Sequence, residues 1–193
     1  IAHATMLGRC GIIKEEEAND IVKGLKGILA DIENGTLHID MEAEDIHTFI
    51  EGELTKRIGD NGKRLHTSRS RNDQVAVDIK LYLKKEVVNV KNLVVGLIKV
   101  IADKAEKYSE IVMPGYTHLQ RAQPITFGHH LLAYGEMLLR DVSRLEDCLK
   151  RMDEMPLGSC ALAGTTYPID RTITAELLGF DRITNNSLDG VSD

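Results

Sequence analysis

Only three of the 193 residues are cysteines, Cys10, Cys148 and Cys160, and no two of them form a CxxC pair. An odd number of widely spaced cysteines argues against a disulfide framework or a zinc site and favours a reducing compartment. No apolar run approaches the roughly 18–20 residues that cross a bilayer. The first ten residues also lack the basic flank and apolar stretch of a signal peptide. We therefore expect a cytoplasmic protein that does not enter a membrane.

The sequence also lacks an excess of positive charge. The 24 basic residues are outnumbered by 30 acidic ones, and the formal net charge of −6 argues against a nucleic-acid partner. The motifs GxSxG, GxGxxG and GxxxxGK[ST] do not occur, so the sequence gives no support for a nucleotide cofactor. His129 and His130 point to different faces of a helix and have no partner four residues on. We accordingly expect no metal site.

Proline is scarce and confined to the second half, at positions 114, 124, 156 and 168. Long helices are therefore possible from residue 15 to residue 113. Apolar residues recur at spacings of three and four in residues 15–34 and again in residues 41–59. A glycine follows or closes each run, at Gly35 and Gly59, and marks a helix end. The spacing predicts one helix in each segment.

Two longer apolar seams follow. From Ile79 to Ile101 the apolar residues step by three or four, which predicts a helix over about 73–107. Such a helix is about 50 Å long and cannot bury its stripe alone. A second seam runs from Leu131 to Met152. We predict an all-α bundle of long helices, joined by non-periodic stretches at 59–73, 113–125 and 156–171, with no strand pattern that competes.

Polar side chains concentrate in "HTSRSRNDQV", residues 66–75, at the expected start of the long helix. One of Ser68, Ser70, Asn72 and Asp73 suits the position that caps the helix. The free amides of a helix N-terminus, together with two arginines, also suit a carboxylate or phosphate. Both interpretations, an anion-binding site and a capped, solvated helix start, are open from the residues alone.

The stretch "MPGYTHLQRAQP", residues 113–124, places His118 beside a hydroxyl and two side-chain amides. Histidine transfers protons near neutral pH, so His118 is a candidate general acid or base. The alternative is a structural or solvated histidine. In "PLGSCALAGTTYPIDR", residues 156–171, small residues predict a compact loop, where any chemistry would depend on the hydroxyls of Ser159, Thr165 and Thr166.

Together these stretches resemble a known family. "HTSRSRNDQVAVDIKLYL", "MPGYTHLQRAQPITFGHHLLAYGEMLLRD", "PLGSCALAGTTYPIDR" and "NNSLDGVSD" are similar, in this order, to segments of argininosuccinate lyases of the fumarase/aspartase superfamily. The resemblance runs over the whole chain. It implies an internal fragment that lacks an N-terminal segment and the C-terminal half, including a loop with a catalytic serine. The fragment alone is therefore expected to be inactive.

The resemblance further implies a fold of long helices, in which residues 1–66 belong to a smaller helical N-terminal domain and residues 67–193 begin the central bundle. It implies a homotetramer with active sites built from three subunits. The implied reaction, in arginine biosynthesis, cleaves argininosuccinate to arginine and fumarate without a metal or organic cofactor. Two alternatives remain: another fumarate-releasing lyase of the superfamily, and a non-catalytic, crystallin-like helical assembly.

Site residues follow from the same resemblance, position by position. His118 matches the active-site histidine, described as proton acceptor or as the partner that polarises the true base. The substrate-binding positions are Ser70, Arg71, Asn72 and Thr117, and residues expected near the site are Asp45, His47 and Gln120. Three positions depart from the family pattern. Glycine is common at Ser68, glycine or another small residue at Cys160, and alanine or serine at Gly190. We expect Ser68 to affect the loop backbone and the other two changes to be mild.

Overall fold

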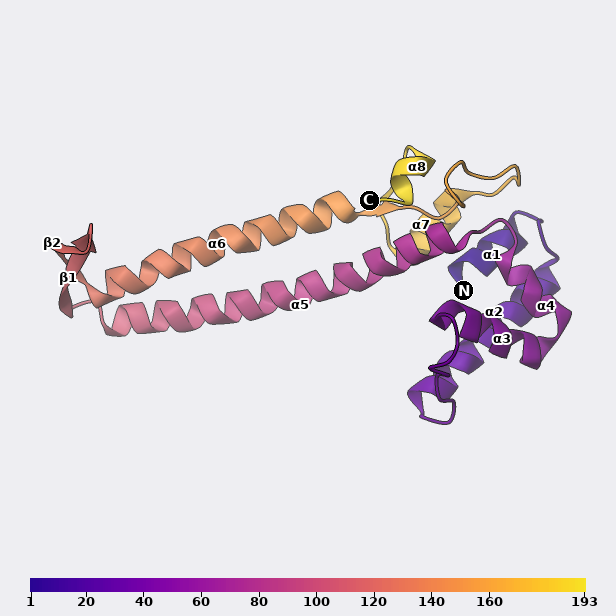
Figure 1. Ribbon diagram of the computed structural model, residues 1–193, viewed down its shortest axis with the longest axis horizontal. Helices are drawn as coiled ribbons and strands as arrows, with labels where there is room; N and C mark the ends of the chain where they lie inside the picture. The colour runs from indigo at the N-terminus through magenta and orange to yellow at the C-terminus, as the bar shows by residue number, and fades with distance from the viewer. The chain divides into compact units, whose positions relative to one another are not determined.

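The computed structural model describes residues 1–193, and most of the chain is helical (Figure 1). The expectation of an all-α fold of long helices is confirmed, with only short strands added. The elements, in chain order, are α1 (Ala2–Arg9), α2 (Glu15–Glu33), α3 (Ile46–Ile58), α4 (Asp60–Lys63), the 3₁₀ turn η1 (Arg64–His66), α5 (Arg71–Lys107), β1 (Val112–Thr117), β2 (Gln120–Thr126), α6 (Phe127–Met152), β3 (Glu154–Met155), α7 (Arg171–Leu178), β4 (Arg182–Ile183) and α8 (Ser187–Gly190).

The four helices that the apolar spacing predicted are α2, α3, α5 and α6. Helix α3 begins five residues later than the periodic run, because the side chain of Asp45 caps it and accepts a hydrogen bond from the amide of Thr48 at 2.6 Å. Both glycine stops are confirmed, since Gly35 and Gly59 have φ values of 72° and 67°. The short helices α1, α4, α7 and α8 were not predicted, because segments of four to eight residues show too little periodicity.

The chain forms two compact units. The first contains residues Ile1–Ile79 and Glu154–Asp193, and the second contains Lys80–Asp153. The core of the first unit is formed by fully buried side chains of α1, α2 and α3, which are Met6, Leu7, Ile21, Ile28 and Leu54. Helices α2 and α3 approach closely at Gly24, where an added Cβ would lie 2.6 Å from Cδ1 of Leu54. This packing holds α3, whose first turns carry candidate site residues, against α2.

The C-terminal part of the first unit is organised around Arg171, the first residue of α7. Its guanidinium donates hydrogen bonds to the backbone carbonyls of Met155, Leu157 and Thr184, at 3.1, 2.7 and 3.0 Å, and to the hydroxyl of Thr184 at 2.8 Å. The parallel pair β3 and β4 is part of the same arrangement. One partly buried side chain thereby satisfies several backbone acceptors around the loop that begins at residue 156.

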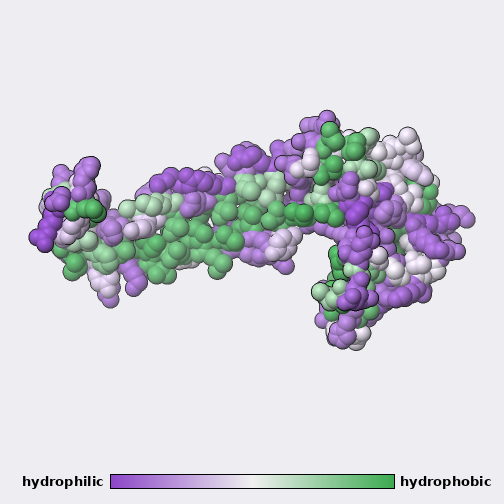
Figure 2. Space-filling model, in the orientation of Figure 1, coloured by the Kyte–Doolittle hydropathy of each residue, from purple (hydrophilic) through white to green (hydrophobic).

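The second unit is an antiparallel helical hairpin. Within it, α6 runs back along α5, with Lys91 paired to Glu146 at 3.4 Å and Lys84 to Asp153 at 2.5 Å (Figure 1). Apolar side chains remain exposed along the hairpin, as the green atoms in Figure 2 show. These residues are Leu83, Val90, Leu93, Leu97 and Val100 on α5, and Leu132, Tyr134, Met137 and Leu139 on α6. We call this set the apolar face of the hairpin. None of the helices combines the length and hydropathy of a bilayer-crossing segment.

Residues 112–126 form a two-stranded antiparallel hairpin, although the sequence pattern indicated an irregular loop there. Strand β1 pairs with β2, and Pro114 faces Pro124 across the pair. Neither proline can donate a hydrogen bond, but each strand has only one neighbour, so both are tolerated. The register shifts between Pro114 and Tyr116, at Gly115. The two prolines and this bulge removed the alternation that would have predicted strands.

Candidate active site

Helix α5 begins with a reciprocal cap at the polar segment that the sequence singled out. The hydroxyl of Ser70 accepts a hydrogen bond from the amide of Asn72 at 3.3 Å. In return, the carboxylate of Asp73 accepts one from the amide of Ser70 at 3.0 Å. This arrangement is a variant of the capping box, because the hydroxyl of Ser70 accepts from the second helical residue and not the third, and it explains two of the polar residues in the segment. The interpretation of the segment as a helix cap is confirmed, while its ability to bind an anion stays a prediction.

Arg71, the first residue of α5, already has carboxylate partners within the first unit. Its guanidinium lies 3.0 Å from Asp45 and 3.3 Å from Glu51. It also donates hydrogen bonds to Thr48 at 3.3 Å and to Gln74 at 2.5 Å. The positive charge of Arg71 is therefore balanced by two acidic side chains of α3 and its cap. A ligand carboxylate would have to compete with them or share the guanidinium.

One carboxylate oxygen of Glu51, Oε1, lies close to three basic side chains. Arg69 lies at 2.7 Å, His66 at 3.2 Å and Arg71 at 3.3 Å. Burial by itself would raise the pKa of Glu51, but the hydrogen bond from His66 and the charges of the two arginines outweigh it and lower the pKa. Glu51 is thus held as a carboxylate that organises the arginines of the segment.

His47 is oriented by two side chains of α5. Its Nε2 lies 2.8 Å from the carboxylate of Asp78, and its Nδ1 lies 3.0 Å from the amide nitrogen of Gln74. Because the carbonyl oxygen of Gln74 accepts from Arg71, its NH₂ group faces His47. Nδ1 is then the acceptor and Nε2–H donates to Asp78. Burial raises the pKa of Asp78, and the charges of His47, Arg69 and Arg71 act in the opposite direction.

The sequence reasoning missed several members of this cluster: Thr48, Glu51, Gln74 and Asp78. A signal for them was present. Arg71, Gln74 and Asp78 are spaced by three and four residues and share one face of α5. His47 and Glu51 have the same relation on α3. Asp45, the cap of α3, has its pKa lowered first by the hydrogen bond from the amide of Thr48 and further by the charge of Arg71.

The compact loop at 156–171 lies against the start of α5. The side-chain amide of Asn72 donates to the backbone carbonyl of Ala161 at 2.8 Å, and the hydroxyl of Ser68 donates to that of Thr165 at 3.2 Å. Ser68 and Cys160 have φ values of 56° and 53°, in the region that favours glycine. At both positions a residue with a Cβ adopts a backbone conformation that favours glycine, and the effect of the change at Cys160 stays a prediction. Ser159 is fully buried, which removes its hydroxyl from contact with a ligand.

Gly190 also has little room for the alanine or serine of the family pattern. An added Cβ would lie 2.7 Å from Oγ1 of Thr184 and 3.0 Å from Oγ of Ser159. Neighbouring hydroxyls would have to shift to accept it. Because Gly190 has no Cβ, the buried side chains of Ser159 and Thr184 can lie close to its backbone.

Thr117 and His118 belong to the second unit, where they lie at the tip of the β1–β2 hairpin. Thr117 pairs with Gln120, and His118 and Leu119 form the two-residue turn between them. Both turn residues have positive φ, 50° and 60°. This is the conformation of a type I′ turn, which asparagine and glycine adopt with much less strain. His118 is exposed, and Leu119 is 95% exposed.

The structure thus divides the predicted site residues between two groups. Asp45, His47, Ser70, Arg71 and Asn72 all belong to the first unit, where hydrogen bonds and ion pairs link Asp45 and His47 to the start of α5. The second group consists of Thr117, His118 and Gln120 at the hairpin tip.

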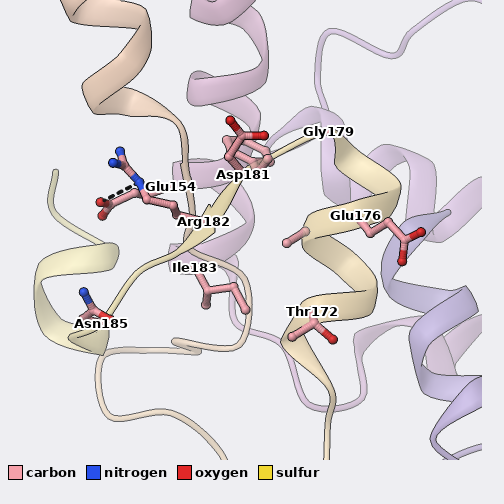
Figure 3. Close-up of a pocket in the computed structure, with 10 residues that line it drawn as sticks. Glu154, Thr172, Glu176, Gly179, Asp181, Arg182, Ile183 and Asn185 are labelled. Carbon is pink, nitrogen blue, oxygen red and sulfur yellow. Dashed lines mark ion pairs between the residues drawn. The ribbon is translucent and has the colours of Figure 1, made fainter.

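Neither group lines the cavity of the first unit that Figure 3 shows. That cavity, of about 790 Å³, lies beside α7 and β4 (Figure 3). Its lining includes Glu176, Asp181 and Glu154, and Glu154 is paired with Arg182 at 3.3 Å. In the second unit, a cavity of about 420 Å³ beside the β1–β2 hairpin includes Thr117 in its lining.

Comparisons with known proteins agree with one another. The model of the lyase family matches residues 2–193. Argininosuccinate lyase from Desulforamulus reducens is 61% identical over 193 residues, which are 100% of this chain and 42% of that protein. Argininosuccinate lyase from Ruthia magnifica is 60% identical over the same length, covering 40% of that protein. The chain therefore spans about two fifths of the length of these curated relatives.

Solved structures show the same fold. A crystal structure of EDDS lyase in complex with formate matches with a TM-score of 0.86 and 33% identity, covering 99% of this chain and 37% of that one. A fumarate lyase:delta crystallin from Brucella melitensis matches with a TM-score of 0.79 at 21% identity, covering 98% of this chain and 46% of that one.

Proposed function

The chain belongs to the lyase family, and from that membership we propose that the full-length protein cleaves argininosuccinate to arginine and fumarate. The observation that carries this proposal is the 61% identity to an argininosuccinate lyase, sustained over every residue of the chain. The same identity supports a place in arginine biosynthesis and in the cytoplasm. It also supports the assignment of residues 1–66 to an N-terminal domain and of residues 67–193 to the start of a central bundle.

The reaction needs fixed hydrogen-bond donors. A base removes a proton from the carbon beside a carboxylate, and the electron pair moves into that carboxylate. The pair then forms the double bond of fumarate as the carbon–nitrogen bond breaks and the departing guanidinium nitrogen takes up a proton. Donors aimed at the charged intermediate stabilise it, and removing one such donor typically costs about 3–4 kcal/mol of barrier. Arginine and fumarate together contain all the atoms of the substrate.

Ser70, Arg71, Asn72 and Thr117 are the proposed substrate-binding residues. Asn72 is exposed and has one amide hydrogen fixed by Ala161, which leaves its second N–H and its carbonyl oxygen for a ligand. The charge of Arg71 is already balanced by Asp45 and Glu51. We therefore assign neutral donors, led by Asn72, the larger share of carboxylate stabilisation.

His118 is the proposed proton-transfer residue or the partner that polarises it, with Gln120 nearby. An exposed imidazole at a hairpin tip is accessible to a ligand. Its left-handed conformation is strained, and such strain often occurs at functional positions. Asp45 and His47 are proposed to act near the site. They lie in the network that also holds Arg71.

The full-length protein is proposed to form a homotetramer with active sites built from several copies. The two long helices of the hairpin leave part of their apolar side chains uncovered, and a bundle needs further helices to bury them. The exposed apolar face of the hairpin and the exposed Leu119 provide surface for such contacts.

The test is an assay of fumarate release by the full-length protein. Argininosuccinate, adenylosuccinate, aspartate and malate are offered separately, and release of fumarate is followed by its ultraviolet absorbance. Turnover of argininosuccinate alone supports the proposal. Preference for another substrate assigns the protein to a different fumarate-releasing reaction, and inactivity on all four favours a crystallin-like helical assembly.

A further inference from the structure

Asp73 is a fully buried carboxylate that the proposed reaction does not use directly. It is the third residue of α5, and its Oδ1 accepts the amide of Ser70 in the capping box. A cap alone needs only one carboxylate oxygen and is normally exposed. The second oxygen, Oδ2, has a separate set of partners.

Those partners lie more than eighty residues away in the sequence. Oδ2 accepts hydrogen bonds from the amide of Gly158 at 3.0 Å and from the amide of Cys160 at 2.8 Å. Gly158 has φ of 91° and Cys160 has φ of 53°, so the loop follows an unusual path at the two contact points. Non-glycine residues persist in such conformations where surrounding contacts fix them. Asp73 supplies those contacts.

The loop that Asp73 anchors also contacts Asn72. Ala161 follows directly after the anchored residues, and its carbonyl accepts the side-chain amide of Asn72 at 2.8 Å. This bond decides which way the amide group of Asn72 faces. We propose that Asp73 is a positioning residue, whose buried carboxylate fixes residues 158–161 against the first turn of α5 and thereby orients the amide of Asn72 toward the substrate. The inference rests on the substrate-binding role proposed for Asn72.

A carboxylate suits this position better than a neutral amide. All three of its hydrogen-bond partners are backbone N–H donors, so both oxygens must accept. An asparagine would turn an NH₂ group toward one or two of these donors. Two cations compensate the buried charge: burial lowers the pKa of Arg69 and of Arg171, and the negative charge of Asp73 acts against that shift in both.

The experiment uses the full-length protein and three variants: Asp73→Asn, Asn72→Ala and the double variant. We expect Asp73→Asn to lower kcat/KM for argininosuccinate by about tenfold to a hundredfold, the range that a misplaced binding group causes. Asp170→Asn is the matched control. Asp170 also caps a helix, through the amide of Thr172 at 2.8 Å, but it is exposed and makes no bond to residues 68–73. It should leave kcat/KM unchanged.

The double variant separates positioning from a general loss of structure. If Asp73 acts through Asn72, adding Asp73→Asn to Asn72→Ala should produce little further loss of kcat/KM. If the two substitutions instead lowered kcat/KM by independent factors that multiply in the double variant, the proposal would be overturned. Amide hydrogen exchange of residues 157–161 is the second readout, because it requires no substrate. Exchange should be slow in the wild type and at least tenfold faster in Asp73→Asn, with no change in Asp170→Asn.

If a variant does not fold, the proposal can still be tested, because amide exchange can be measured on the wild type alone. Fast exchange at Gly158 and Cys160 in the wild type would show that the carboxylate does not anchor the loop, and would overturn the inference. If exchange follows the expectation while the full-length protein cleaves none of the offered substrates, the proposed function fails and the anchoring by Asp73 stands.

Discussion

Acidification should destabilise the segment that leads into α5, because His3 is buried as a neutral imidazole. His3 lies on α1, is only 5% exposed, and its Nε2 lies 2.9 Å from the backbone carbonyl of Thr67. A carbonyl only accepts, so Nε2 carries the hydrogen. Burial, assisted by the charge of Arg69, lowers the pKa of His3 from 6.5 to about 4. The Thr67 carbonyl directly precedes Ser68 and the capped start of α5.

The direction and size of the effect follow from linkage. The unfolded chain protonates His3 below its ordinary pKa of 6.5, whereas the folded chain does so only below about 4. Unfolding therefore takes up a proton between these values, and stability falls as the pH drops through that range. The full difference between the two pKa values corresponds to about 3 kcal/mol in the free energy of unfolding. About 2 kcal/mol of it is lost between pH 7 and pH 5.

The assay is urea denaturation followed by circular dichroism at pH 7 and pH 5, applied to the wild type and His3→Gln. Glutamine can keep a donor near Nε2 but does not titrate, so the variant should lose about 2 kcal/mol less than the wild type between the two pH values. His38→Gln, at an exposed histidine, is the control and should behave as the wild type. Equal losses in the wild type and His3→Gln would refute the reasoning.

Three further predictions concern the second unit. In the full-length protein, His118→Asn should lower the rate of fumarate release by about 10²–10⁴, the usual range for lost acid–base help, and an unchanged rate would exclude the proposed role. Leu119→Gly should relieve the positive φ and raise stability to denaturant by about 1 kcal/mol, so a fall in stability would contradict the turn geometry. Leu97→Asp should shift the full-length protein to smaller species in size-exclusion chromatography, because a charge is costly in the apolar face through which we propose that copies associate. Lys99→Asp, at an exposed polar position of the same helix, should not change the size of the species.

The long helices were predictable because each repeats its apolar spacing over several turns. The start of α5 was predictable as a candidate site because capping residues and arginines crowd into a few positions. The partners of Arg71 were harder to predict. They come from α3 and from the next turns of α5, and only the folded chain shows that Glu51 and Gln74 share its guanidinium.

Two features were beyond sequence reasoning. The β1–β2 hairpin lacks alternation and turns through His118 and Leu119, which are poor residues for a type I′ turn. The second role of Asp73 depends on a loop more than eighty residues away. Periodicity carries no information about such a contact, because the loop contributes backbone amides to it and not side chains.

The unbroken helix α5 limits how the length of the chain can change during evolution. It runs for 37 residues without proline. Inserting one residue would rotate everything beyond it by about 100° and turn the side chains that face α6 away from that helix. An insertion of seven residues restores the phase to within about 20°, provided that α6 lengthens equally. Natural length variation in this hairpin should therefore be rare, occur in steps such as seven or eleven residues that restore the phase, and appear in both helices together.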